Sequence, residues 1–360
     1  MTKRKVVVGM SGGVDSSVAA HLLHEAGYEV IGITMQIWPE DAPREESGGC
    51  CGLTAVDDAR RVCQQLGIPH YTLNFRDEFN KYVIDYFIDE YQRGRTPNPC
   101  IACNRFVKWE SLLTKALQLG ADYIATGHYA RILFDQETGR YLLKKAATSK
   151  KDQTYALYNL TQEQLARTLM PLGDYTKEEV RRIAAAIGLN VANKPDSQEI
   201  CFIPDHDYGR FIEEHASSTS GPGNFVDRQG RILGQHKGII HYTVGQRKGL
   251  GLAVGKPVYV LEIRPESNEV VVGTDEEVYQ QTVYADQLNF IPFDRLATQQ
   301  AVTAKIRYNH DPAPATVTMV DDNTLRCDFT EPQRAITPGQ ALVLYDGDLV
   351  VGGGSIIKGA

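Results

Sequence analysis

The chain has 360 residues, 42% hydrophobic and 23% charged, and its 38 Lys and Arg against 45 Asp and Glu give a net charge of −7. This ordinary composition excludes disorder, collagen and coiled coil as descriptions of the whole chain, and the length favours two or three domains. No apolar run exceeds five residues, whereas a membrane helix needs roughly 20. The basic start has no adequate apolar stretch before Ser11. We therefore expect no signal peptide, no membrane partner and a cytoplasmic location.

The first half of the chain alternates short β-rich runs with helical stretches. We predict strands at 5–9, 29–35, 70–74 and 123–126, and helices at 14–26, 54–66, 79–91 and 105–119. Two capping boxes, at 161–164 and 176–179, mark further helices at 162–169 and 177–187. This order predicts an α/β domain with a doubly wound parallel sheet and helices on both faces.

The composition shifts near Pro204, and from Ser217 onward Gly, Pro and Asn punctuate short β-like runs. We predict strands at 224–226, 258–263, 270–272, 301–308, 315–320, 342–345 and 350–356. This half is therefore expected to be mostly β, consistent with a small barrel or sandwich. The predicted domains are 1–205, 206–278 and 279–360. The stretch 40–52 lacks periodicity, so we expect a mobile loop there.

Positive charge is concentrated in three parts of this acidic chain. The windows 91–109 and 236–256 each hold four basic residues and no acidic one. The window 131–151 holds six basic residues and two acidic ones, a net charge of +4. Taken singly, each is typical of a solvated loop. Together they favour a polyanionic partner, because local patches rather than net charge decide nucleic-acid binding.

A glycine-rich turn links the first predicted strand to the first predicted helix. Residues 10–17 read MSGGVDSS. Gly12 and Gly13 leave room for backbone to approach a phosphate, and amides at a helix N-terminus and serine hydroxyls can donate to it. Asp15 is a plausible Mg²⁺ ligand. Two adjacent glycines alone are typical of an ordinary turn, and the string is not the GxxxxGK[ST] of the Walker loop.

The seven cysteines do not indicate a disulfide framework, because the count is odd and a reducing compartment is expected. They are Cys50, Cys51, Cys63, Cys100, Cys103, Cys201 and Cys327. Zinc binding at Cys100 and Cys103 would need two more soft ligands, and no second CxxC or HxxxH pattern follows. A thioredoxin-like reading is weaker still, because a polar turn precedes the pair.

Cys103 is the cysteine whose surroundings favour reactivity. It precedes Asn104, which we expect to be the N-cap of a helix beginning near Arg105. A thiol at a helix N-terminus beside basic residues should have a lowered pKa. Cys201, between Pro195 and Pro204, is by its sequence context typical of an inert core thiol.

The loop string resembles that of the PP-loop ATP pyrophosphatases, and five further segments resemble the tRNA-specific 2-thiouridylase family. These segments are TPNPCIACN at 96–104, ATGHYAR at 125–131, KDQTY at 151–155, SQEICF at 197–202 and GQRKGLG at 245–251. The resemblance runs from residue 5 to about residue 355. It implies ATP-dependent 2-thiolation of the wobble uridine, in which the C2 oxygen is adenylated, a cysteine persulfide delivers sulfur, and AMP and pyrophosphate are released.

The resemblance also implies partners and site residues. The partners are ATP with Mg²⁺, the anticodon region of tRNA and an upstream persulfide donor protein. The implied ATP-binding residues are Gly9, Met10, Ser11, Gly12, Gly13, Val14, Asp15, Ser16, Met35 and Gly127. Cys201 is implied as the persulfide carrier and Cys103 as its catalytic partner. The implied contacts to the target base are Asn98, Pro99 and Cys100. The implied tRNA contacts are His128, Lys151, Asp152, Gln153, Arg307, Tyr308 and Gln340, and the predicted domain 279–360 is implied to contact tRNA.

Several alternatives stay open from the sequence. Some family members carry Asp where this chain has Cys100, and that carboxylate is a candidate general acid or base, a role that is unfilled or moved here. Cys100, Cys103 and Cys201 could instead hold a 4Fe–4S cluster with one open iron, as in some related tRNA thiolases, which is a second hypothesis. Another PP-loop ligase acting on a small carboxylate or amide would explain the loop but not the two cysteines. A nucleotide-sensing RNA-binding protein would use neither cysteine. Pyrophosphate release that depends on tRNA separates these functions.

Overall fold

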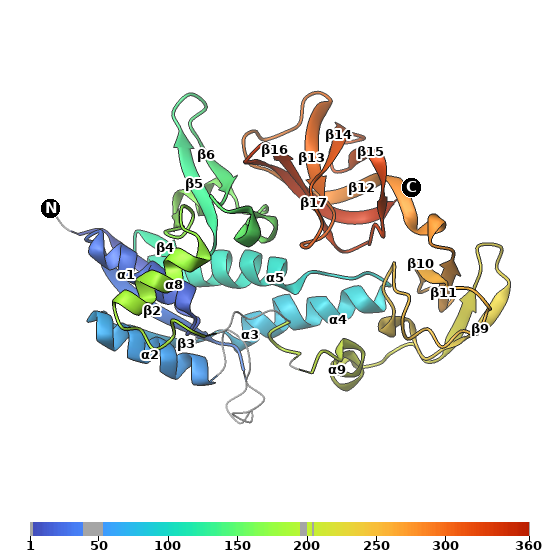
Figure 1. Ribbon diagram of the computed structural model, residues 1–360, viewed down its shortest axis with the longest axis horizontal. Coiled ribbons are helices and arrows are strands. Elements are labelled where there is room, and N and C mark those ends of the chain that lie inside the picture. The colour runs from blue at the N-terminus through green and yellow to red at the C-terminus, as the bar shows by residue number, and fades with distance from the viewer. Residues whose placement is uncertain (1–2, 39–52, 195–199, 204, 360) are drawn as a thin grey trace. The chain divides into compact units, whose positions relative to one another are not determined.

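The computed structural model describes residues 3–38, 53–194, 200–203 and 205–359. The chain forms two compact units (Figure 1). The α/β unit comprises Met1–Val83, Cys100–His206 and Asp348–Val350, and the β-rich unit comprises Ile84–Pro99, Asp207–Gly347 and Val351–Ala360. The predicted mobile loop at 40–52 lies outside the described residues.

A five-stranded parallel sheet, ordered β3-β2-β1-β4-β7, is the centre of the α/β unit. Its strands are β1 (Lys5–Gly9), β2 (Glu29–Gln36), β3 (His70–Asn74), β4 (Tyr123–Ala125) and β7 (Thr168–Leu169). Strand β1 is central, and its Val7 pairs with Ile31 of β2 and Ile124 of β4. Val6, Val7 and Val8 are all fully buried, as expected for a strand covered on both faces. The predicted parallel sheet is confirmed.

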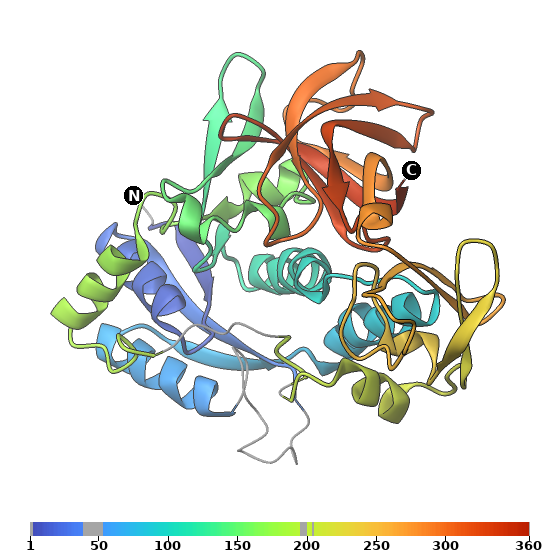
Figure 2. The same cartoon turned by 45° about the vertical axis from the view of Figure 1, so that its right-hand side comes forward.

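The sheet lies between helices (Figure 2), and successive residues of a strand such as β1 face opposite sides of it. Val6 and Val8 join the hydrophobic cluster formed with α1 (Val14–Glu25), α2 (Leu53–Leu66) and α8 (Lys177–Ala186). The other layer is built from α3 (Arg76–Phe79), η2 (Cys103–Leu112) and α6 (Leu113–Gln118). Trp109 and Leu112 of η2 are essentially fully buried. Thr161 and Thr176 each cap a helix through a capping box, as predicted, at α7 (Gln162–Ala166) and α8.

Two helical stretches begin earlier than the sequence predicts. The first runs through α3, η1 (Asn80–Ile84) and α4 (Asp85–Gln92), and the second runs through α5 (Pro99–Ala102), η2 and α6. In both, the middle segment is wound as a π-helix, a geometry that is frequent at functional sites. The second starts at Pro99 rather than Arg105, because proline suits the first helical position. The predicted N-cap role of Asn104 is therefore wrong.

A β-hairpin that the sequence did not indicate completes the α/β unit. It consists of β5 (Ala130–Asp135) and β6 (Arg140–Lys145), and Leu349 pairs with Lys144 of β6. Short 3₁₀ turns follow at η3 (Ser149–Lys151) and η4 (Thr154–Ala156). No helix among the described residues is long and apolar enough to span a membrane.

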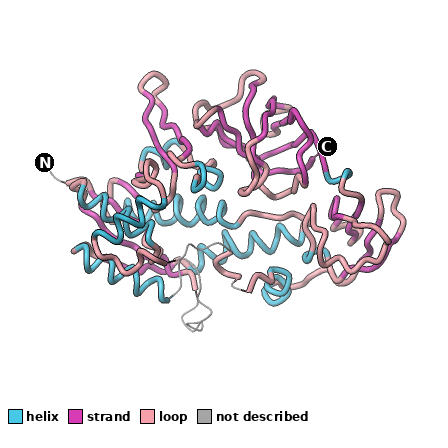
Figure 3. The backbone as a smooth tube through the Cα atoms, viewed as in Figure 1, coloured by secondary structure: helices cyan, strands magenta, loops and turns pink. Residues whose placement is uncertain are grey.

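The β-rich unit contains two sheets, and its predominance of strands is evident in Figure 3. One sheet has the order β10-β11-β8-β9, with β8 (Gly223–Val226), β9 (Ile232–His236), β10 (Tyr259–Arg264) and β11 (Glu269–Gly273). Besides α4, short helices of this unit are α9 (Tyr208–His215), η5 (Ile239–His241) and η6 (Glu276–Val278). This sheet belongs to the mostly β region predicted after residue 205.

The second sheet closes on itself as a barrel. Its strands are β12 (Tyr279–Phe290), β13 (Gln300–Lys305), β14 (Ala313–Met319), β15 (Leu325–Arg334), β16 (Ala341–Asp346) and β17 (Leu349–Gly359). They follow the order β12-β15-β14-β13-β16-β17, and β12 also pairs with β17. Val283, Val317, Phe329, Leu344 and Ile356 are in its core. The predicted small β-barrel is confirmed.

Candidate functional site

The glycine-rich loop lies where β1 ends, between Gly9 and Val14. Gly12 has a φ of +64°, and a Cβ there would collide with the Ala55 carbonyl of α2. The Ser11 backbone N–H donates to Ser16 Oγ at 3.2 Å, which closes the loop over the first turn of α1. No side chain caps the described N-terminus of α1. Its first backbone N–H groups can therefore donate to an anion such as phosphate.

Asp15, in the first turn of α1, is held by two side chains. Lys177 Nζ lies 2.7 Å and 2.8 Å from its two carboxylate oxygens, and Tyr129 Oη donates to Oδ1 at 2.7 Å. The Lys177 side chain is 9% exposed and that of Asp15 is 30% exposed. Lys194 binds the other side of the loop, where its Nζ donates to the Gly12 carbonyl at 3.1 Å and to Asp58 at 2.7 Å.

Met35 and Gly127 lie at the same edge of the sheet as Gly9. Met35 is near the end of β2 and is 8% exposed, while Gly127 follows β4. A Cβ at Gly127 would stand 2.6 Å from the Ser16 backbone nitrogen, so only glycine allows the chain to pass this close to α1. The carboxyl edge of a parallel sheet is the usual ligand-binding edge, and it brings together the predicted ATP-binding residues.

The segments that carry Cys103 and Cys201 belong to the α/β unit and pack against neighbouring turns of one helical stretch. Phe202 meets Phe79 of α3 edge to face, with ring centroids 5.7 Å apart. Phe106, one turn after Cys103, stacks on Tyr82 of η1 at 5.2 Å. Both cysteines are partly exposed. The fold therefore brings to one helical stretch two segments that are far apart in the sequence.

The surroundings of Cys103 differ from the predicted helix N-terminus. Cys103 is the first residue of η2, within a helix that starts at Pro99. Asn104 is buried; its Nδ2 donates to the Ala156 carbonyl at 2.9 Å, and its Oδ1 accepts from Lys108 Nζ at 2.8 Å. Asn104 thus connects η2 to η4, and it places the Lys108 ammonium one turn away from Cys103.

Three protein-family models match consecutive parts of this chain. The tRNA methyl transferase HUP domain matches residues 4–205, the tRNA methyl transferase PRC-barrel domain 209–274, and the aminomethyltransferase beta-barrel domain 280–356. The tRNA-specific 2-thiouridylase MnmA of Lachnoclostridium phytofermentans is 64% identical, with 99% of this chain and 100% of that protein covered. The protein of that name from Acetivibrio thermocellus is 62% identical over the same shares. The chain belongs to the tRNA-specific 2-thiouridylase family. A further member, from Clostridium perfringens, is 59% identical over 99% of both chains.

The cysteines of this 2-thiouridylase family member do not form a metal site in the described part of the chain. Residues 3–38, 53–194, 200–203 and 205–359 contain no group of three or more His, Cys, Asp or Glu side chains that could hold a metal ion. The described residues therefore give no support to the 4Fe–4S cluster considered from the sequence on Cys100, Cys103 and Cys201. Cys63 and Cys327 are core thiols, and burial raises the pKa of each to about 12. Cys50 and Cys51 lie outside the described residues.

His128, predicted to contact tRNA, lies beside η2. Its Nδ1 is 2.7 Å from Thr126 Oγ1, and its ring centroid is 5.6 Å from that of Trp109. Burial, with a smaller contribution from the Lys108 charge, holds the pKa of His128 well below its usual value. The imidazole is therefore neutral at pH 7, so it would contact RNA by stacking or hydrogen bonding.

The three residues at 151–153 differ in how their side chains are used. Asp152 accepts from the Ala146 backbone N–H at 3.0 Å and from Thr154 Oγ1 at 2.7 Å. Gln153 Oε1 accepts from the Tyr129 backbone N–H at 2.9 Å. Both side chains shape this turn, while Lys151 ends η3 with a partly exposed side chain. Their contact with tRNA stays a prediction.

In the β-rich unit, the segment before Asn98 is attached to the barrel. The Thr96 backbone N–H donates to the Pro338 carbonyl at 2.8 Å, and Gln340 Nε2 donates to the Thr96 carbonyl at 2.7 Å. Gly339, with a φ of +91°, packs against Thr96. Among the predicted tRNA contacts on the barrel, Arg307 donates to the Arg334 carbonyl at 2.9 Å and Tyr308 is 42% exposed.

Sequence reasoning missed Lys177, Tyr129 and Lys194 at the loop. One signal was available for the first of them. Lys177 directly follows the N-cap Thr176, at the first helical position, where an acidic residue is favoured by the helix dipole. The link between Lys194 and Gly12 spans 182 residues and leaves no local pattern in the sequence.

Proposed function

We propose that this protein catalyses the ATP-dependent 2-thiolation of the wobble uridine of tRNA in the cytoplasm. The relatives' name, tRNA-specific 2-thiouridylase, over 99% of the chain supports the reaction class. The observation that carries the proposal is the uncapped α1 N-terminus, at the sheet edge of the unit that also contains Cys103 and Cys201. We assign the chemistry to residues 1–205, a linking role to 206–278 and tRNA contact to 279–360.

The loop would bind the phosphates of ATP. Backbone N–H groups of the first α1 turn and the hydroxyls of Ser11 and Ser16 are the donors, and Gly12 and Gly13 allow close approach. Attack of the uridine C2 oxygen on the α-phosphate forms the adenylated base and releases pyrophosphate. Mg²⁺, when bound, supplies charge neutralisation there, and Asp15 is the loop carboxylate that could hold it. The loop donors stabilise the departing pyrophosphate.

Cys201 would carry the sulfur as a persulfide received from a donor protein. Its outer sulfur attacks C2 and displaces AMP, which leaves the base joined to Cys201 through two sulfur atoms. The Cys103 thiolate then attacks the Cys201 sulfur. The bond between that sulfur and the sulfur on C2 breaks, and 2-thiouridine leaves with both bonding electrons. The product is a Cys103–Cys201 disulfide, which an external dithiol must reduce. In the alternative route Cys103 acts instead as an acid–base group.

Pyrophosphate release measured with and without unmodified tRNA tests this function. We expect release to depend on tRNA and the tRNA to gain one sulfur atom by mass spectrometry. Asp15→Ala and Ser16→Ala should lower release at least about 100-fold, because each removes a group from the loop. Arg182→Ala, which changes an exposed side chain of α8, is the matched control. Release that proceeds equally without tRNA would instead indicate a small-substrate ligase.

A further inference from the structure

Lys177 occupies a position where helix electrostatics disfavour a lysine. It is the first residue of α8, where the unpaired N–H groups make the helix end positive. The Lys177 side chain is only 9% exposed, and this burial is unfavourable because the ammonium loses much of its hydration. Thr176 and Glu179 already form a capping box at this end, so α8 does not need Lys177 to begin. A lysine in this position therefore needs an anionic partner.

The anion that Lys177 meets is in the nucleotide loop. Lys177 Nζ contacts both carboxylate oxygens of Asp15, and Asp15 is in the first turn of α1. The ammonium is therefore placed at the positive end of two helices, α1 and α8, which pack together. The Asp15 carboxylate therefore faces the Lys177 ammonium and the N-termini of both helices, and the Asp15 side chain is partly exposed.

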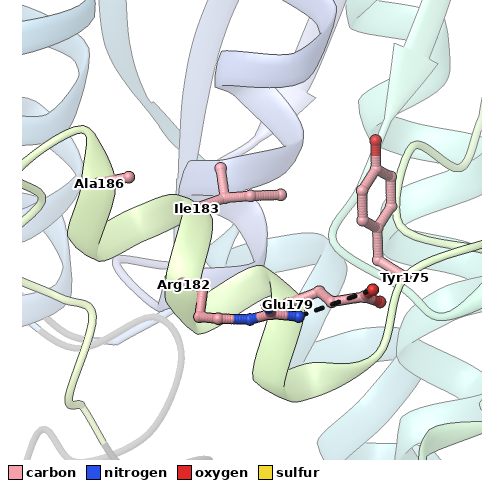
Figure 4. Close-up of a pocket in the computed structure, with 5 residues that line it drawn as sticks. All are labelled: Tyr175, Glu179, Arg182, Ile183 and Ala186. Carbon is pink, nitrogen blue, oxygen red and sulfur yellow. Dashed lines mark ion pairs between the residues drawn. The ribbon is translucent and has the colours of Figure 1, made fainter.

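The nearby surface hollow on α8 does not account for Lys177. That hollow, with a volume of about 370 Å³, is lined by Tyr175, Glu179, Arg182, Ile183 and Ala186 (Figure 4). Arg182 and Glu179 form an ion pair at 3.8 Å within it. Lys177 is not among its lining residues, and its ammonium is bound instead to Asp15.

We propose that Lys177 is a phosphate-binding residue. Its ammonium pairs with Asp15 until the nucleotide phosphates take the place of the Asp15 carboxylate. The inference rests on the proposed function in taking ATP as the ligand. A largely buried ammonium that gives up a carboxylate partner loses a strong interaction, so the exchange requires another anion, and phosphate oxygens supply it. The competing explanation is that Lys177 only ties α8 to α1 through Asp15.

Binding of inorganic pyrophosphate without Mg²⁺ separates the two explanations, because no catalysis is needed. The decisive comparison is between Asp15→Asn and the double variant Asp15→Asn/Lys177→Met, measured by calorimetry. Once Asp15 is neutral, a lysine that only pairs with it has no remaining role. A phosphate-binding lysine still has one, so we expect the double variant to bind pyrophosphate about 10- to 100-fold more weakly than Asp15→Asn.

The control is Asp15→Asn/Arg182→Met, which removes a cation from an exposed position of the same helix. It should bind pyrophosphate as Asp15→Asn does, which excludes a general effect of net charge. Thermal unfolding provides a second readout, because pyrophosphate should raise the melting temperature of Asp15→Asn more than that of the double variant. The double variant carries no unpaired member of the Lys177–Asp15 pair, so its folded state should persist.

Equal pyrophosphate affinity of Asp15→Asn and Asp15→Asn/Lys177→Met would overturn the proposal and leave the proposed function intact. If the wild type and Asp15→Asn both fail to bind pyrophosphate, the nucleotide site and this inference are overturned together. If the expected difference appears but the wild-type protein does not thiolate tRNA, the proposed function is wrong and the role of Lys177 stands.

Discussion

The two units present their candidate residues in different ways. In the α/β unit, the side chain of Asp15 has two fixed partners, Lys177 and Tyr129, at one edge of a sheet. In the β-rich unit, Gln340 and Arg307 each donate to a backbone carbonyl, and Tyr308 is exposed. A paired, partly buried carboxylate suits bond making, whereas guanidinium, amide and aromatic side chains on a barrel suit contact with RNA. Substitutions should therefore change turnover in the first unit and mainly binding or positioning in the second.

The largest effect is expected at the two cysteines of the α/β unit. Cys103→Ser and Cys201→Ser should each lower tRNA thiolation at least about 1000-fold, because a hydroxyl cannot carry or accept the sulfur. Binding of ATP and tRNA should be unchanged. Mass spectrometry of the tRNA and filter binding measure the two quantities. A Cys201→Ser enzyme that thiolates tRNA from a sulfur donor would contradict the persulfide route.

The buried cysteines are the matched controls for that prediction. Cys63→Ala and Cys327→Ala should retain activity, because burial raises the pKa of both thiols to about 12 and keeps them protonated. Each should lose about 1–2 kcal/mol of unfolding free energy, since a packed sulfur is removed from a core. Urea unfolding measures this loss. A large fall in thiolation with an unchanged stability would instead give a core cysteine a chemical role.

The sequence predicted those parts of the fold and site whose signals are local. The string at 10–17 and the capping boxes depend on adjacent residues, and the structure contains both the loop and the capped helices. The start of the helical stretch that contains η2 was misplaced because Asn104 resembles a cap, while its amide actually bonds to Ala156. The hairpin β5–β6 was missed because its exposed residues, Leu133 and Phe134, break the usual alternation.

Contacts between distant parts of the chain could not be predicted in this way. Lys177 and Asp15 are 162 residues apart, and Gln340 and Thr96 are 244 residues apart. Neither pair has a sequence spacing that would reveal it, because the fold alone brings its members together. The roles implied for Asp152 and Gln153 similarly said nothing of their bonds to neighbouring backbone, which the structure shows.

An intermediate effect is expected for two partly exposed cations. Lys151→Glu and Arg307→Glu should each weaken tRNA binding about tenfold, and the salt dependence should become less steep by about one ion per lost phosphate contact. ATP affinity should not change. Lys151 belongs to the α/β unit, so it tests whether the unit or the kind of side chain decides the effect. Dissociation constants measured over a salt series that show no salt dependence would contradict phosphate contact at either residue.

The smallest effect is expected at Gln340, where positioning and tRNA binding can be told apart. Its amide donates to the Thr96 carbonyl, and the Thr96 backbone N–H donates to the Pro338 carbonyl. Thr96 lies two residues before Asn98, the first residue of the predicted target-base segment. Gln340→Leu removes one neutral hydrogen bond, so thiolation under saturating tRNA should fall about two- to tenfold with an unchanged tRNA dissociation constant. Gln281→Leu is the matched control, because the Gln281 amide likewise donates to a barrel carbonyl, that of Phe329, at 2.9 Å. If Gln340→Leu weakens tRNA binding while saturated turnover stays normal, Gln340 contacts the RNA directly and does not act through Thr96.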